Sequence, residues 1–166
     1  RSRRGGCNVA VCLVGGSFAS FLEPTVHRSI QRNLVEAVAA GCHREVFVVV
    51  DEAEMREVAG AEADFDADLD ATLRATLARL NFTVASARAV GAPAPPSSCG
   101  PLVEEGNSFG SGGIDSLPLP PTSARAMLAG ASTCYGLVEK FEVDAYPTTL
   151  RFDWIVKARL DSAWAQ

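Results

Sequence analysis

Two short apolar runs constrain the fold of this chain more than any other feature of its sequence. Asn8–Val14 (NVAVCLV) ends at Gly15 and Gly16, and residues 46–50 (VFVVV) end at Asp51. A strand without a polar face must be covered on both sides, as happens in a parallel sheet that has helices on both faces. The two runs therefore predict buried strands of an α/β fold.

Segments with helical periodicity separate the apolar runs. Pro24 suits the first turn of a helix, where its missing N–H group is not needed, and apolar residues then recur every four positions to about residue 40. Later segments continue the alternation: a helix over 69–80, a weaker strand over 82–87, a helix from Thr122 or Ser123, and a strand over 151–158. This order predicts a Rossmann-like α/β half with a mostly parallel sheet of about four strands and flanking helices.

Residues 91–121 differ in composition from the rest of the chain. More than half of them are Gly, Pro or Ser, and they include most of the nine prolines. Such a stretch buries little apolar area, so we expect a mobile insertion within one domain that spans residues 1–166. Because the chain begins with Arg1, we expect this domain to be an incomplete part of a longer protein.

Composition excludes several classes of protein. The chain is 48% hydrophobic, which argues against disorder, yet no apolar run approaches the roughly 20 residues of a membrane span. With 15 basic and 20 acidic side chains the net charge is −5, which argues against nucleic acid as the main partner. The five cysteines are scattered, so we expect at most two disulfides (Cys7, Cys12, Cys42, Cys99 and Cys134).

Most short motifs that could carry chemistry are absent or weak. No P-loop is present, and the first strand is not followed by a G-x-G-x-x-G sequence. The acidic run over 64–70 lacks the glycine and glutamate of a calcium loop, so we expect it to lie at a helix start. His27 and His43 are expected at the surface or as capping residues. Gly15 and Gly16 either let a ligand approach the backbone or serve simply as a tight exit from the strand.

Two charged residues, Arg159 and Asp161, follow the carboxyl end of the last predicted strand. In the sheets of α/β proteins, ligands bind beyond these ends, which places residues 15–21, Asp51 and Glu52, and residues 159–161 around the candidate site. Asp161 could supply a carboxylate oxygen to Mn2+ or Mg2+, and Arg159 could bind a phosphate. The alternative is a salt bridge between Arg159 and Asp161, with Trp154 and Trp164 in the core.

The segment FDWIVKARLDSAW, after a helix containing CYGLVEKFE, resembles a group of eukaryotic glycosyltransferase-like proteins abundant in algae and plants. The opening VAVCLVGG is similar to that group's first strand and glycine turn. The resemblance implies a GT-A-like fold in which an Arg-x-Asp motif replaces Asp-x-Asp. It assigns the metal to Asp161, a phosphate or structural role to Arg159, and contacts with a nucleotide-sugar to Gly15, Gly16 and the adjacent Ser17.

The resemblance predicts the donor-binding part of a metal-dependent glycosyltransferase, which transfers a sugar from a nucleotide-sugar to an unknown acceptor. The acceptor-binding half would follow Gln166, so we expect residues 1–166 to be inactive alone, and no catalytic residue is assigned. The alternative is a non-catalytic Rossmann-like binding module. It is favoured by residues 17–21, which lack the arginine that this group usually places after the glycine turn.

Asn81-Phe82-Thr83 matches the acceptor triplet for N-glycosylation, a pattern that also occurs often by chance. The resemblance favours the secretory pathway and the Golgi lumen as the compartment, and the cytoplasm remains the alternative. In the lumen, two disulfides and one remaining thiol would account for the odd number of cysteines.

Overall fold

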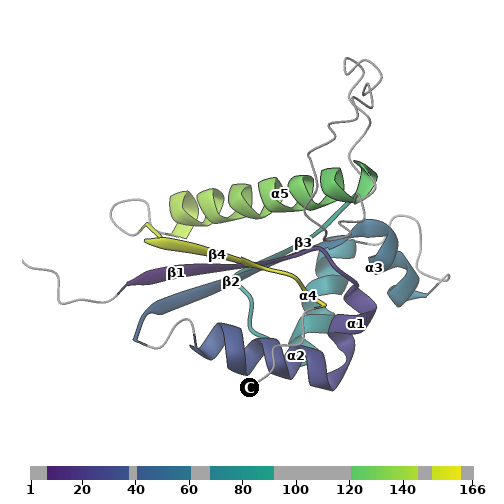
Figure 1. The fold of residues 1–166 in the computed structure, drawn as a ribbon, viewed down its shortest axis with the longest axis horizontal. Helices are drawn as coiled ribbons and strands as arrows, with labels where there is room; N and C mark the ends of the chain where they lie inside the picture. Colours follow the sequence, from purple (N-terminus) through teal and green to yellow (C-terminus); the bar gives the residue numbers. More distant parts are fainter. Residues whose placement is uncertain (1–6, 38–40, 61–67, 92–120, 146–150, 162–166) are drawn as a thin grey trace, which may run out of the picture.

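Four parallel strands form the central sheet in the order β3-β2-β1-β4 (Figure 1). Their bounds are Asn8–Val14 for β1, His43–Asp51 for β2, Ser86–Val90 for β3 and Trp154–Ala158 for β4. The structure is a computed structural model that describes residues 7–37, 41–60, 68–91, 121–145 and 151–161. The expected α/β class with a Rossmann-like parallel sheet and flanking helices is therefore confirmed.

Helices cover both faces of this sheet (Figure 1). Five helical segments contribute to one core: α1 (Phe18–Leu22), α2 (Pro24–Ile30), the π-helical turn η1 (Gln31–Glu36), α3 (Glu52–Ala59) and α4 (Leu69–Arg79). The long helix α5 (Pro121–Ala145) covers the other face. None of the described helices is both long and apolar enough to cross a membrane.

Alternate residues of β1 enter two separate cores, which explains why its sequence has no polar face. Val9, Val11 and Leu13 pack among the apolar side chains of α1, α2 and α4. Ala10, Cys12 and Val14 pack with β2 and α5 on the opposite face, together with Cys134 and Val138. Every residue of β1 after Asn8 is therefore buried.

The chain reverses its direction across the sheet after β3. It steps from β1 to β2 and then to β3, and α5 carries it back to β4 on the other side of β1. Since right-handed crossovers in opposite directions place their helices on opposite faces, the reversal explains why α5 lies apart from the other helices. The point of reversal is the boundary between β1 and β4.

Several predicted boundaries differ from the structure. The third strand was expected over 82–87 but begins at Ser86, because Phe82 instead closes the end of α4 by donating its N–H to the Leu77 carbonyl. The fourth strand begins at Trp154, and the short helices α1 and α3 were not expected. Residues 92–120 of the predicted insertion lie outside the described residues, so that prediction stays untested.

Candidate functional site

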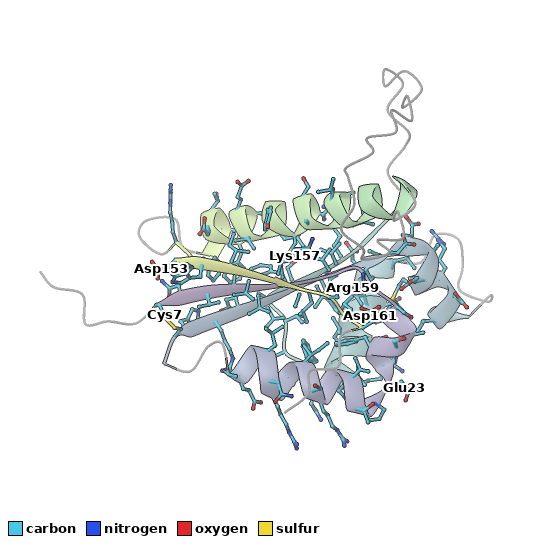
Figure 2. All side chains as sticks on the ribbon, viewed as in Figure 1. Cys7, Glu23, Asp153, Lys157, Arg159 and Asp161 are labelled. Atoms are coloured by element: carbon cyan, nitrogen blue, oxygen red, sulfur yellow. A yellow bond between two sulfur atoms is a disulfide. The ribbon has the colours of Figure 1, made fainter. Side chains whose placement is uncertain are left out.

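The candidate site lies where the carboxyl ends of β1 and β4 meet (Figure 2). The two strands pair as far as Leu13 and Ala158, and the next loop residues stay together because the Leu160 N–H donates to the Gly15 carbonyl over 3.0 Å. Ligands of open α/β sheets bind beyond the strand ends at such a reversal of strand order. The glycine turn and the Arg-x-Asp segment are therefore brought to the position where a ligand is expected.

Gly15 and Gly16 both adopt left-handed backbone conformations, with φ of 67° and 82°. Glycine adopts this region at no steric cost, whereas other residues are strained there. Gly16 has a second requirement, because a Cβ built on it would lie 2.5 Å from Cγ of Asp161 and 2.9 Å from its Oδ2. The carboxylate of Asp161 thus lies directly over the backbone of Gly16, while the space beside Gly15 is open.

Arg159 and Asp161 form a bidentate ion pair. Arg159 Nε donates to Oδ1 over 2.9 Å, and its Nη2 donates to Oδ2 over 2.8 Å. This pair lowers the pKa of the Asp161 carboxyl, mainly through the hydrogen bond from Arg159, while partial burial opposes the shift and the Ser17 N–H adds to it. The pKa of Arg159 is raised by the same hydrogen bond. Arg159 and Asp161 are thus joined by the salt bridge considered as the alternative above.

Ser17 connects the glycine turn to α1. Its side-chain hydroxyl accepts from the Ser20 N–H over 3.2 Å, which caps the first turn of the helix. The next N–H group, that of Phe18, donates to Oε2 of Glu54 in α3 over 2.7 Å. Glu54 was not expected at the site, and its position within α3 gave no motif that could have identified it.

The two carboxylates expected to frame the site from β2 have local partners. Asp51 accepts from the Ala53 N–H over 2.8 Å and so caps α3, and Glu52 pairs with Arg56 over 2.6 Å. A Cβ on Gly91, which follows β3, would lie 3.1 Å from Glu52 Oε2. These carboxylates lie at the strand ends as expected, and their described contacts stabilise α3.

Two expectations about side-chain burial were wrong. Trp154 would be in the core under the salt-bridge alternative, yet it is 69% exposed on β4, while Trp164 lies outside the described residues. His27 was expected at the surface or as a capping residue, but it is 7% exposed and packs against Phe21, with 6.1 Å between ring centroids. His43 is exposed as expected and lies 3.1 Å from Glu45.

The donor set at this site suits a hard cation only in combination with other ligands. The Asp161 side chain is 24% exposed, and each of its carboxylate oxygens already accepts a hydrogen bond from Arg159. Across the described residues, no three His, Cys, Asp or Glu side chains gather closely enough to hold a metal ion. Magnesium commonly binds through one or two carboxylates plus substrate phosphates and water. The single carboxylate fits this mode, in which the remaining ligands come from a phosphate and from water.

The described residues define an α/β protein with a four-stranded, Rossmann-like parallel sheet and an Arg–Asp pair over a glycine turn at the reversal of strand order. No protein-family model matches this chain, and comparisons with curated proteins and with solved structures give no match either. The geometry of the site therefore carries the functional argument.

Proposed function

We propose that this domain binds the nucleotide-sugar donor of a metal-dependent glycosyltransferase. The observation that carries the proposal is the contact between Gly16 and Asp161 where the strand order reverses. This is the region where α/β sheets bind nucleotides, and it unites an open backbone turn with a carboxylate and a guanidinium. The acceptor and the sugar are not specified by these residues.

Each residue of the site has a role in this proposal. Asp161 would hold Mn2+ or Mg2+, and the bound cation would supply neutralisation of the charge that develops on the departing diphosphate. Arg159 presents a planar fork of N–H donors that matches phosphate as well as it matches a carboxylate. Gly15 leaves the backbone open beside the site, so a ligand ring can approach it closely.

A non-catalytic Rossmann-like binding module is the second candidate. The observation that favours it is the mutual pairing of Arg159 and Asp161, which satisfies both charges without a ligand. Binding of a metal and a diphosphate would have to compete with this pair. A measurement of donor binding therefore separates the two candidates.

The test is thermal and chemical unfolding of the full-length protein with UDP- and GDP-sugars in the presence and absence of Mn2+. A donor present at a hundred times its Kd adds about 2.7 kcal/mol to the free energy of unfolding. We expect a Mn2+-dependent gain with one donor class, and we expect Asp161→Asn to abolish it. Asp153→Asn is the matched control, since Asp153 is an exposed carboxylate at the opposite end of β4 (Figure 2).

If no donor changes the unfolding free energy of the folded protein, the non-catalytic module is the better account. If a donor binds equally well to wild type and Asp161→Asn, the metal role of Asp161 is wrong, while the nucleotide-binding role of the glycine turn survives.

A further inference from the structure

We propose that Asn81 is an N-glycosylation site and that this domain matures in the oxidising lumen of the secretory pathway. The inference is independent of the proposed function, because it uses neither the glycine turn nor Asp161. Asn81-Phe82-Thr83 has the sequence of an acceptor triplet, with a residue other than proline in the middle position.

Asn81 occupies the turn that ends α4. Its N–H donates to the Ala78 carbonyl over 3.0 Å, and the Phe82 N–H donates to the Leu77 carbonyl over 3.0 Å. These two bonds form a Schellman cap, in which the residue after the helix takes a left-handed conformation, and Asn81 has φ of 55°. The Asn81 side chain is exposed and makes no hydrogen bond to another described residue, so its amide is accessible.

The helix cap explains why asparagine is found at position 81, because Asn tolerates the left-handed region better than most residues. The cap does not explain Thr83. Phe82 is buried and packs edge-on against Phe21, with 5.3 Å between ring centroids. Thr83 is exposed, and its hydroxyl has no hydrogen bond to a described residue. The helix cap thus accounts for Asn81 and core packing accounts for Phe82, whereas no described contact accounts for Thr83.

A glycan on Asn81 would be attached toward the amino end of the sheet. The turn precedes β3, and the chain joins the sheet where the Ala85 N–H donates to the Val46 carbonyl, toward the amino end of β2. Gly16 and Asp161 lie at the carboxyl ends of the strands. The triplet therefore lies toward the end of the strands opposite to the candidate site.

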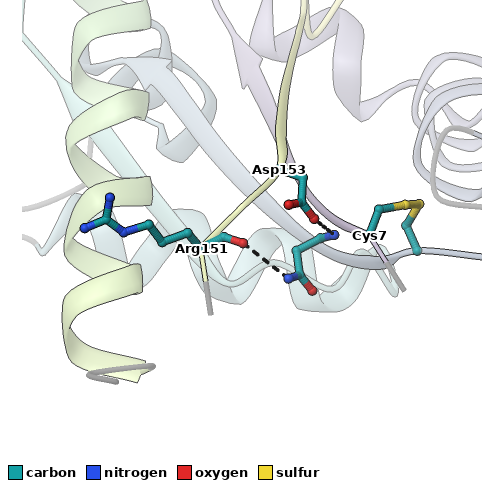
Figure 3. The surroundings of a disulfide bond; sticks show 5 residues. Cys7, Arg151 and Asp153 are labelled. Carbon is teal, nitrogen blue, oxygen red and sulfur yellow. Dashed lines mark hydrogen bonds between the residues drawn. A yellow bond between two sulfur atoms is a disulfide. The ribbon is translucent and has the colours of Figure 1, made fainter. Parts of the chain in front are cut away.

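Two disulfides provide an independent indication of the compartment. Cys12 of β1 and Cys134 of α5 are both fully buried and are bonded across the second core, with 6.1 Å between their Cα atoms. Cys7 is bonded to Cys42, next to the hydrogen bonds by which Asn8 contacts Asp153 and Arg151 (Figure 3). Disulfides persist in secretory compartments and are rare in the cytosol, where thiols are kept reduced.

The covalent steps need two co-reactants of the lumen. The Asn81 amide nitrogen attacks the anomeric carbon of an oligosaccharide linked to a lipid diphosphate, so that a C–N bond forms and the C–O bond to the diphosphate breaks. The amide loses a proton and the lipid diphosphate leaves. Each disulfide forms when two thiols pass two electrons and two protons to a disulfide-bearing oxidant by thiol–disulfide exchange.

The test expresses the full-length protein in eukaryotic cells and treats it with a glycosidase that removes N-glycans and converts the linked asparagine to aspartate. Mass spectrometry of the peptide containing residue 81 then measures occupancy. We expect modification in wild type and in Thr83→Ser, and none in Thr83→Ala or Asn81→Gly. Thr83→Ala keeps the native cap, and Asn81→Gly suits the left-handed turn, so misfolding does not explain a loss in either variant.

Digestion of the same protein without reduction should release the linked peptides Cys7–Cys42 and Cys12–Cys134. An unmodified Asn81 in folded wild-type protein would overturn the glycosylation proposal. A protein retained in the cytosol whose cysteines all react with an alkylating reagent would overturn the assignment of compartment as well. Modification that survives Thr83→Ala would also contradict the proposal, because it would not depend on the triplet.

Discussion

Gly16 and Asp161 are in steric contact, although 145 residues separate them along the chain and each belongs to a different strand end. Because Gly16 has no side chain, the carboxylate of Asp161 can lie directly against its backbone. In that position the carboxylate accepts both donors of Arg159 and is partly shielded from water. The contact therefore determines where the Asp161 carboxylate lies and how Arg159 pairs with it.

The first prediction compares alanine at the two turn glycines. Gly15→Ala should lower the free energy of unfolding by about 1–2 kcal/mol, the cost of a left-handed backbone for a residue with a Cβ. Gly16→Ala adds a clash with Asp161 and should cost at least about 1 kcal/mol more. Urea denaturation measures both values. In the Asp161→Ala background the difference should shrink, and equal costs in the wild-type background would refute the contact.

The second prediction concerns acid pH. Because the folded-state pKa of Asp161 is lowered below its ordinary 3.8, the ion pair stabilises the fold fully above that value, and this stabilisation is lost as the pH falls through the folded pKa. Urea titrations from neutral pH to acid should show a steeper loss of stability in wild type than in Asp161→Asn. The two curves should converge at the acid end. Parallel curves over this range would show that the carboxyl titrates as in the unfolded chain.

The third prediction concerns two glycines of α5. A Cβ on Gly130 would lie 2.6 Å from Cγ1 of Val14, whereas one on Gly136 would meet no atom within 4 Å. Gly136→Ala should therefore stabilise the protein by roughly 0.5–1 kcal/mol through helix propensity. Gly130→Ala should destabilise it by about 1–3 kcal/mol, because the helix must move away from β1. Opposite signs in chemical denaturation are the expected result, and stabilisation by both would contradict the close packing of α5.

The fourth prediction compares the disulfides. Cys12 and Cys134 are 122 residues apart, and Cys7 and Cys42 are 35 apart. In the chain-entropy account the longer loop contributes about 1 kcal/mol more, because the entropy removed from the unfolded state rises with the logarithm of loop length. Replacing each pair by alanines and measuring unfolding free energies should show the larger loss for Cys12 and Cys134. A larger loss for the other pair would contradict this account.

The sequence predicted the parts of the fold that depend on local pattern. The bounds of β1 agree with the prediction because its apolar run ends at a glycine pair, and the alternation of strands and helices was enough to give the parallel sheet. Because ligands bind at the carboxyl ends of parallel strands, the sequence also predicted that Gly16 and Asp161 lie in the same region.

The remaining features depend on tertiary contacts that leave no periodic signal. The helix α1 has five residues, and its first turn depends on Glu54, which comes from a different helix. His27 is buried because Phe21 and neighbouring side chains cover it, although its own position in the sequence is flanked by a basic residue. The pairing of Arg159 with Asp161 was one of two alternatives, and spacing alone does not distinguish them.

The bond between Cys12 and Cys134 also changes how this protein would carry mechanical force. Tension applied through the amino end of β1 and the carboxyl end of β4 would pass along the covalent path from Cys12 to Cys134, which excludes β2, β3 and α4. The load would then act as shear between the paired strands β1 and β4, whose junction holds Gly16 and Asp161. Once this bond is reduced, the same tension would also extend the residues between Cys42 and Cys134.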